Sequence, residues 1–127
     1  MRKKLFYPLF AFVVALSLTG VALAWDDTTL KGAAIVDVAC SANVAKGGAS
    51  AADGHSGSKG CATKPGCEKS GYGAYADGKY IQFADAKSNE LAKAALAKAS
   101  KETGAKFTVV GKVDAGKMTV ASITEEK

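Results

Sequence analysis

The sequence predicts a mixed α+β domain in which five strands form an OB-fold-like barrel, with one helix between the third and fourth strands. Three observations lead to this prediction. A β-branched run opens the globular part of the chain, two hairpin patterns follow it, and an alanine-rich helical segment separates the two hairpins. An open antiparallel sheet with one packed helix is the alternative, because strand order cannot be read from a single sequence.

The start of the chain is typical of a secretory signal peptide. Residues 1–24 begin with basic side chains, continue with an apolar run and end in Ala22-Leu23-Ala24. This order predicts cleavage before Trp25, and an uncleaved anchor is the alternative reading of the apolar run. We therefore expect residues 25–127 to form a single exported domain, periplasmic or secreted, without a stable membrane anchor.

The first part of this domain combines a strand with a long connection. Residues 30–39 contain the β-branched pair Ile35-Val36 and predict the first strand, with a bulge at Gly32. Residues 41–60 are rich in Gly, Ala and Ser and contain almost no large apolar side chain, so they predict a long loop. Because the first loop of an OB-fold borders its usual binding face, we expect a site to depend on this segment.

Two hairpins and one helix complete the predicted fold. Asp77-Gly78 predicts a tight turn between two aromatic-rich strands within residues 71–85. Alanine, leucine, lysine and glutamate favour a helix over residues 85–103. Alternating apolar residues in 106–123 predict a second hairpin around Asp114-Ala115-Gly116.

Charge and motif content exclude several classes of function. Without residues 1–24 the formal net charge falls from +5 to +2, and no clustered basic face indicates a nucleic-acid partner. The chain has no Cys-x-x-Cys pair for thioredoxin-like exchange and no Cys-x-x-Cys-His for attached haem. Because a glycine-rich loop holds a catalytic Cys/His pair poorly, we do not expect an enzyme.

The side chains that carry chemistry lie close together in the sequence. The only histidine, His55, and all three cysteines, Cys40, Cys61 and Cys67, fall within 28 residues. Three thiolates and one imidazole form a tetrahedral ligand set for Zn, and soft sulfur ligands also suit Cu. Asp37 would orient His55 from behind this ligand set, as carboxylates often do for metal-bound imidazoles. A solvent-facing strand residue is the alternative interpretation of Asp37. The pattern predicts a module that sequesters or traffics a metal in the envelope.

A disulfide is the alternative explanation of the cysteines. Five residues separate Cys61 from Cys67, whereas structural zinc sites usually have roughly two to four between paired ligands. Pro65-Gly66 predicts a turn that would bring the two thiols together, although Cys40 could bond to either, and the odd count leaves one thiol over. Under this hypothesis the protein is a disulfide-stabilised binding module without a metal, and His55 is a solvated loop residue.

An aromatic surface would serve such a binding module. Four rings of the first hairpin would lie on the strands that form the usual OB binding face: Tyr72, Tyr75, Tyr80 and Phe83. Aromatic side chains stack on sugars and bases, while alternate residues of a small barrel must also fill its core. We expect a small ligand, an oligosaccharide or another envelope protein as the partner of this face.

The chain also resembles a known family. Gly32, Asp37 and Cys40 form a G…D-x-x-C pattern that precedes a histidine and two cysteines, and V-x-G-K-V-D…G-K-M-T-V-x-S-I closes the chain. This arrangement is similar to small exported bacterial proteins of unknown function that carry an OB-like domain. The resemblance implies that fold over most of the exported part. Those proteins space their paired cysteines more closely than Cys61 and Cys67, so the resemblance transfers no ligand role to them.

Overall fold

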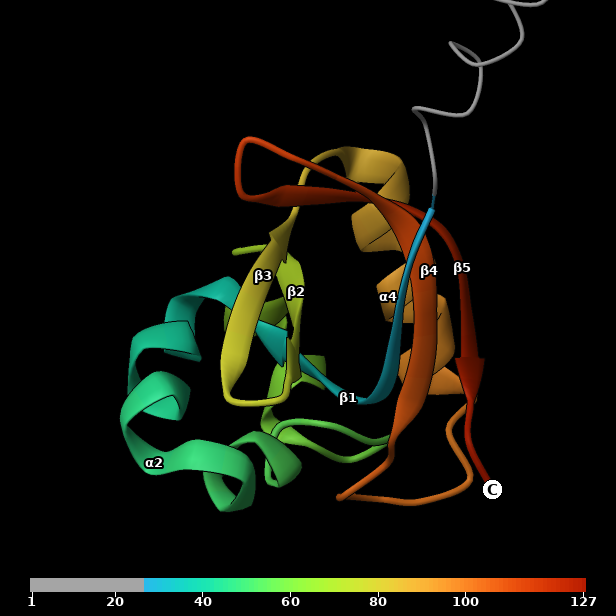
Figure 1. Cartoon of the computed structure of the whole chain (residues 1–127). Coiled ribbons are helices and arrows are strands. Elements are labelled where there is room, and N and C mark those ends of the chain that lie inside the picture. Colours follow the sequence, from blue (N-terminus) through green and yellow to red (C-terminus); the bar gives the residue numbers. More distant parts are fainter. Residues whose placement is uncertain (1–26) are drawn as a thin grey trace, which may run out of the picture.

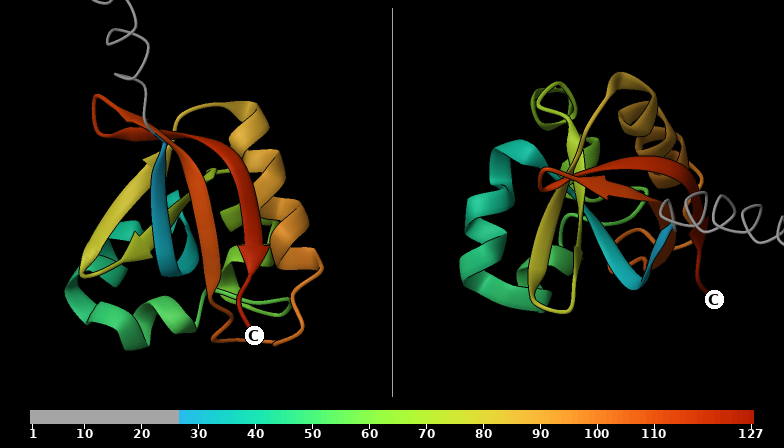
Figure 2. Two further views of the ribbon diagram at one scale, coloured as in Figure 1. Left: turned by 45° about the vertical axis from the view of Figure 1, so that its right-hand side comes forward. Right: turned by 45° about the horizontal axis from the view of Figure 1, so that its top comes forward.

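The computed structural model describes residues 27–127, and the predicted signal peptide, residues 1–24, lies outside the described residues. Within the described residues, no helix has both the length and the apolar character needed to cross a membrane. In chain order the elements are β1 (Thr28–Asp37), the 3-10 turn η2 (Val38–Cys40), α2 (Ser41–Asp53), the 3-10 turn η3 (Cys61–Thr63), α3 (Pro65–Glu68), β2 (Tyr72–Ala76), β3 (Lys79–Phe83), α4 (Ala86–Ala97), β4 (Phe107–Asp114) and β5 (Lys117–Glu125). The fold is mixed α+β with one five-stranded sheet, as the sequence predicts. Helices α2 and α4 lie on opposite sides of the strands (Figures 1 and 2).

The strands are hydrogen-bonded in the closed order β1-β2-β3-β5-β4. Strand β1 has two partners because its first half pairs with β4 and its second half pairs with β2, both antiparallel. The register shifts between Leu30 and Ala33, where Gly32 has a φ of 65°. Glycine adopts this left-handed conformation without strain, so the predicted bulge at Gly32 is confirmed. Strands β3 and β5 pair in parallel, so the sheet is not purely antiparallel.

Both hairpin turns lie where the sequence predicts them. Asp77 and Gly78 connect β2 to β3 with φ values of 51° and 78°. Ala115 and Gly116 connect β4 to β5 with φ values of 52° and 80°. Two consecutive positive φ values are the geometry whose twist matches a two-residue hairpin, so these turns set the register of both strand pairs.

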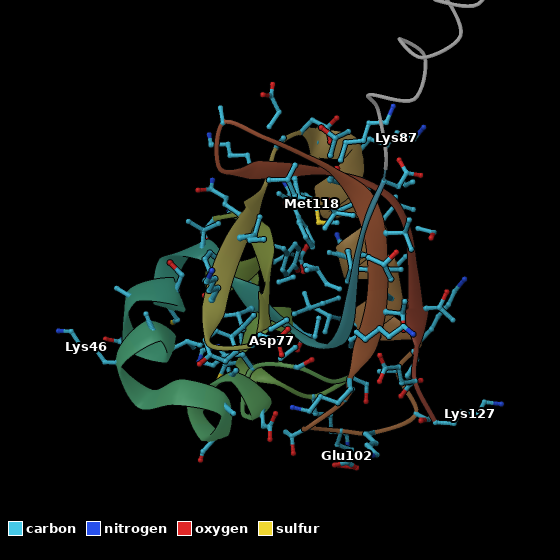
Figure 3. The ribbon with its side chains drawn as sticks, viewed as in Figure 1. Lys46, Asp77, Lys87, Glu102, Met118 and Lys127 are labelled. Carbon is cyan, nitrogen blue, oxygen red and sulfur yellow. The ribbon has the colours of Figure 1, made fainter. Side chains whose placement is uncertain are left out.

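The main core lies between the strands and α4. Strand β4 alternates buried and partly exposed residues over its first half, which places Phe107 and Val109 inside. Figure 3 shows the sulfur of Met118, from β5, inside the molecule near α4, and this side chain is fully buried. The largest members of this cluster are Ile35, Tyr72, Phe83, Leu96, Phe107 and Met118.

Helix α4 is shorter than the sequence predicts. Asp85 caps its start, but the helix ends at Ala97 and not at Thr103. The residues beyond it make tertiary hydrogen bonds instead, and the Ser100 backbone N–H donates to the Glu125 carboxylate at 2.9 Å. Contacts of this kind outweigh the helix propensity of the lysine and alanine residues that follow Ala97.

Residues 41–60 are not the long loop that the sequence predicts. Their first part forms α2, which Gly48 divides into two helical stretches because its φ of 73° is left-handed. Alanine, the strongest helix former, is frequent in this segment, and Val44 and Ala52 are buried against β1 and β2. The scarcity of large side chains, which favoured a loop, instead lets α2 lie close to the strands, while Lys46 points to solvent (Figure 3).

Candidate metal centre

The end of β1 provides the first two residues of the site. Asp37 is the last residue of β1, and Cys40 closes η2 directly after it. The Asp37 Oδ2 accepts a hydrogen bond from the backbone N–H of Cys40 at 3.1 Å and thereby caps η2. This turn explains how an Asp-x-x-Cys spacing places a carboxylate and a thiol side by side.

His55 completes a cluster with these two residues. Its Nδ1 lies 2.9 Å from Oδ1 of Asp37, and the donor atoms of Asp37, Cys40 and His55 all lie within 4.8 Å of one another. Because an ionised carboxylate only accepts hydrogen bonds, Nδ1 carries the proton in this contact and Nε2 is left for another partner. The contact predicted between Asp37 and His55 is present, and its role toward a metal stays a prediction.

Ser56 fixes the backbone beside His55. Ser56 is fully buried. Its Oγ accepts a hydrogen bond from the Ile35 N–H at 3.1 Å and donates one to the Ala105 carbonyl at 2.7 Å. The Ala105 N–H donates back to the Ser56 carbonyl at 3.1 Å. The chain after α2 is thus tied to β1 and to the approach to β4. Sequence reasoning missed this residue, because a serine inside a Gly/Ser-rich segment carries no sign of burial.

Cys67 lies against the same cluster. Ser70, just after α3, accepts a hydrogen bond from the Ala39 N–H at 3.0 Å and donates to the Cys67 carbonyl at 2.6 Å. These bonds hold α3 against η2. The Cys67 thiol lies near the Asp37 carboxylate and the Cys40 thiol, and both affect its pKa.

Cys61 is less closely involved than the other predicted ligands. It begins η3, where its backbone N–H donates to the Gly54 carbonyl at 3.2 Å. Its charge raises the pKa of Cys67, and the two side chains are not hydrogen-bonded to each other. The structure therefore brings together Asp37, Cys40 and His55, with Cys67 near Asp37 and Cys40 and with Cys61 near Cys67.

The buried Asp37 carboxylate dominates the electrostatics of the site. Burial by itself raises the pKa of Asp37. The hydrogen bonds with His55 and Cys40 lower this pKa by more than burial raises it, so it lies below the ordinary value. Burial and the Asp37 carboxylate together raise the pKa of Cys40 to about 11, and the same causes raise the pKa of Cys67. Both thiols are then protonated at neutral pH, a state that does not favour a cysteine nucleophile.

The disulfide predicted as the alternative is not formed. In the described part of the chain Cys40, Cys61 and Cys67 are all free thiols, each partly exposed. Nor is His55 the solvated loop residue which that alternative expected. Its side chain is only 15% exposed and is held by Asp37.

The predicted aromatic ligand face is not open. Tyr72, Tyr75 and Phe83 are at most 9% exposed, and Tyr80 packs partly buried against the side chains beneath α2. The hydroxyls of Tyr72 and Tyr80 each donate to a backbone carbonyl at 3.2 Å. Tyr72 and Phe83 belong to the main core. Tyr75 and Tyr80 pack in the cluster with the buried residues of α2. These rings therefore contribute to packing and are not available for stacking on a ligand.

The clustered donors fit a borderline or soft metal ion. Imidazole nitrogen, thiolate sulfur and carboxylate oxygen are the usual ligands of zinc, and the first two also bind copper. Donor atoms around a tetrahedral zinc lie roughly 3.3–3.8 Å apart, as follows from its bond lengths, and one donor atom each of Asp37, Cys40 and His55 lies within 4.8 Å of the others. Comparison of the chain with protein-family models, curated proteins and solved structures finds no match.

Proposed function

We propose that this protein is a small metal-binding module that holds one Zn or Cu ion through Cys40, His55 and Cys67, with Asp37 orienting the imidazole. The observation that supports the proposal most strongly is the convergence of Asp37, Cys40 and His55 from two separate segments of the chain, with Cys67 of a third segment nearby.

The fold supports an OB-fold-like barrel as the scaffold of this module. The closed order β1-β2-β3-β5-β4, with α4 between β3 and β4, agrees with the arrangement expected of that fold. The connection from β1 to β2 corresponds to its first loop, and it carries His55 and all three cysteines. The site thus depends on the first loop, although α2 gives that loop a helical structure.

Each ligand has a distinct role in the proposed site. His55 binds through Nε2, because Nδ1 faces Asp37. Cys40 and Cys67 bind as thiolates after their protons are released, and the positive metal then offsets the negative charge that Asp37 brings into the site. Cys61, near Cys67, is the remaining candidate for a fourth ligand and contributes less than the other two thiols.

The module would act outside the cytoplasm, where it sequesters or delivers its metal. This part of the proposal depends on the signal peptide expected over residues 1–24. Intact-mass measurement of protein purified from cells that express the full chain tests it directly. Export predicts the mass of residues 25–127, and the mass of the full chain would contradict it.

Metal analysis tests the binding proposal. Protein purified without chelators should contain about one zinc or copper per chain. His55→Ala should lose most of this metal, while Lys46→Ala, on the solvent side of α2, should retain it. A metal content that is the same in both variants would contradict the proposed site.

A further inference from the structure

We propose that Cys40 and Cys67 form a reversible disulfide whose formation expels the metal, so that the thiol–disulfide state of the surroundings controls the site. The inference rests on the proposed metal-binding function, because the metal and the disulfide would use the same two sulfur atoms. It assigns the redox pair to residues that are far apart in the sequence, in place of the neighbouring Cys61 and Cys67.

The backbone segments that carry the pair are already joined. The Val38 N–H donates to the Gly71 carbonyl at 2.9 Å. One residue later, the Ala39 N–H donates to the Ser70 hydroxyl, which itself donates to the Cys67 carbonyl. This chain of hydrogen bonds holds η2 and the end of α3 side by side, so that bridging the two segments needs no movement of either one across the surface.

The two thiols themselves are near neighbours, because each affects the pKa of the other. A disulfide needs a sulfur–sulfur distance of about 2.05 Å and neighbouring Cβ atoms. Because hydrogen bonds already hold η2 beside the end of α3, closing that distance requires rotation of the two side chains and an adjustment of α3. Both Cys40 and Cys67 are partly exposed, so a small oxidant can reach them from solvent.

Cys61 is not expected to be part of this pair. The segment between Cys61 and Cys67 contains the end of η3 and the start of α3 at Pro65, so it is not a simple turn. The Cys61 backbone N–H is also bound to the Gly54 carbonyl, which joins the start of η3 to the residue after α2. Oxidation of Cys40 and Cys67 therefore leaves Cys61 as the unpaired third thiol.

The oxidant in this step is a small-molecule disulfide. A thiolate of the pair attacks one of its sulfur atoms, which forms a mixed disulfide and releases one small thiol. The other protein thiolate then attacks the protein sulfur of the mixed disulfide, which forms the Cys40–Cys67 bond and releases the second small thiol. Two protein thiols are oxidised, one small disulfide is reduced, and the two protons leave on the released thiols. Of the three proposed ligands only His55 then remains, with the Cys61 thiol near the site, and these are too few ligands to retain the metal.

Disulfide mapping with zinc titration tests the inference on protein purified from cells that express the full chain. The reduced, metal-free protein is incubated with oxidised glutathione, alkylated and digested. We expect a Cys40–Cys67 bond in the wild type, with Cys61 alkylated. Cys40→Ser and Cys67→Ser should form no internal bond. Cys61→Ser is their matched control and should form the same bond as the wild type. The oxidised protein should bind no zinc, and a thiol reductant should restore about one equivalent.

The outcomes separate this inference from the proposed function. Three results would overturn the inference: a bond that involves Cys61, thiols that stay reduced in both wild type and Cys61→Ser, or an oxidised protein that binds zinc as tightly as the reduced one. In each case, zinc binding by the reduced protein leaves the proposed function intact. A reduced protein that binds neither zinc nor copper would overturn the proposed function, and the metal control with it.

Discussion

The fully buried carboxylate of Asp37 lies 2.9 Å from the imidazole of His55, which follows it by 18 residues in the chain. Helix α2 makes up most of that separation, so this contact links the end of β1 to the segment that leaves the helix. A carboxylate in this position fixes the orientation and the tautomer of the ring. The following predictions depend on this contact and on the packing that maintains it.

Asp37→Asn tests the orienting role of the carboxylate. The substitution keeps the shape of the side chain but removes the negative charge that fixes His55. We expect zinc affinity, measured by competition with a chelator, to fall about 10–100-fold. Asp77→Asn is the matched control, because Asp77 lies in the β2–β3 turn and asparagine tolerates its positive φ. Equal affinities in the two variants would contradict the orienting role.

Ser56→Ala tests the hydrogen bonds that hold the backbone next to His55. The substitution leaves the buried Ile35 N–H and Ala105 carbonyl without their hydroxyl partner. We expect the free energy of unfolding to fall by about 1–3 kcal/mol, measured by urea denaturation. Ser122→Ala, on an exposed position of β5, should change it by less than about 0.5 kcal/mol. If both variants unfold alike, Ser56 does not stabilise this region.

Gly111→Ala tests the close approach of β4 and β5. A Cβ at Gly111 would lie 2.2 Å from the Thr119 carbonyl oxygen, at the place where the register of this strand pair shifts. Because the obstructing atom is backbone, we expect a loss of about 1–3 kcal/mol or more in thermal unfolding. Gly66→Ala, whose Cβ would meet no atom within 4 Å, should be tolerated. A stable Gly111→Ala variant would show that the strands can separate without cost.

Asp85 should make the stability of α4 depend on pH. Hydrogen bonds from Ser88 lower the pKa of Asp85 below its ordinary value of 3.8. The carboxylate therefore stabilises the fold fully above that ordinary value, and its contribution is lost as pH falls through the lower pKa of the folded state. Asp85→Ala should lower the melting temperature at neutral pH, whereas Asp85→Asn, which still caps the helix, should lower it less.

The pH profile supplies the second half of that test. The difference in melting temperature between wild type and Asp85→Asn should shrink as both are acidified, because only the wild type loses a charge at this position. A difference that is constant from neutral pH to about pH 2 would mean that the Asp85 charge does not stabilise α4.

The predictable parts of the fold are those fixed by local geometry. Asp77-Gly78 and Ala115-Gly116 determine their turns through backbone conformation alone, and Gly32 marks its bulge in the same way. The end of α4 could not be predicted, because it depends on the hydrogen bond from Ser100 to the distant Glu125. Helix α2 was missed for a similar reason, since small side chains are compatible with a loop until the strands that bury them are known.

The candidate site likewise has one part that follows from the local sequence and another that depends on long-range contacts. The three-residue spacing of Asp37 and Cys40 is bridged within one turn, so their proximity follows from the sequence. The choice between Cys61 and Cys67 does not, because it depends on how Ser70 holds α3 against η2. The sequence pattern predicted the candidate residues, and long-range contacts determine which of them meet.

X-ray absorption spectroscopy of the zinc-loaded protein tests the central claim most directly. We expect a first coordination shell with sulfur at about 2.3 Å and nitrogen at about 2.0–2.1 Å. The nitrogen contribution should disappear in His55→Ala, and the sulfur contribution should decrease in Cys67→Ser. A shell of oxygen and nitrogen alone in the wild-type protein, or one that neither substitution changes, would contradict a metal centre built from Cys40, His55 and Cys67.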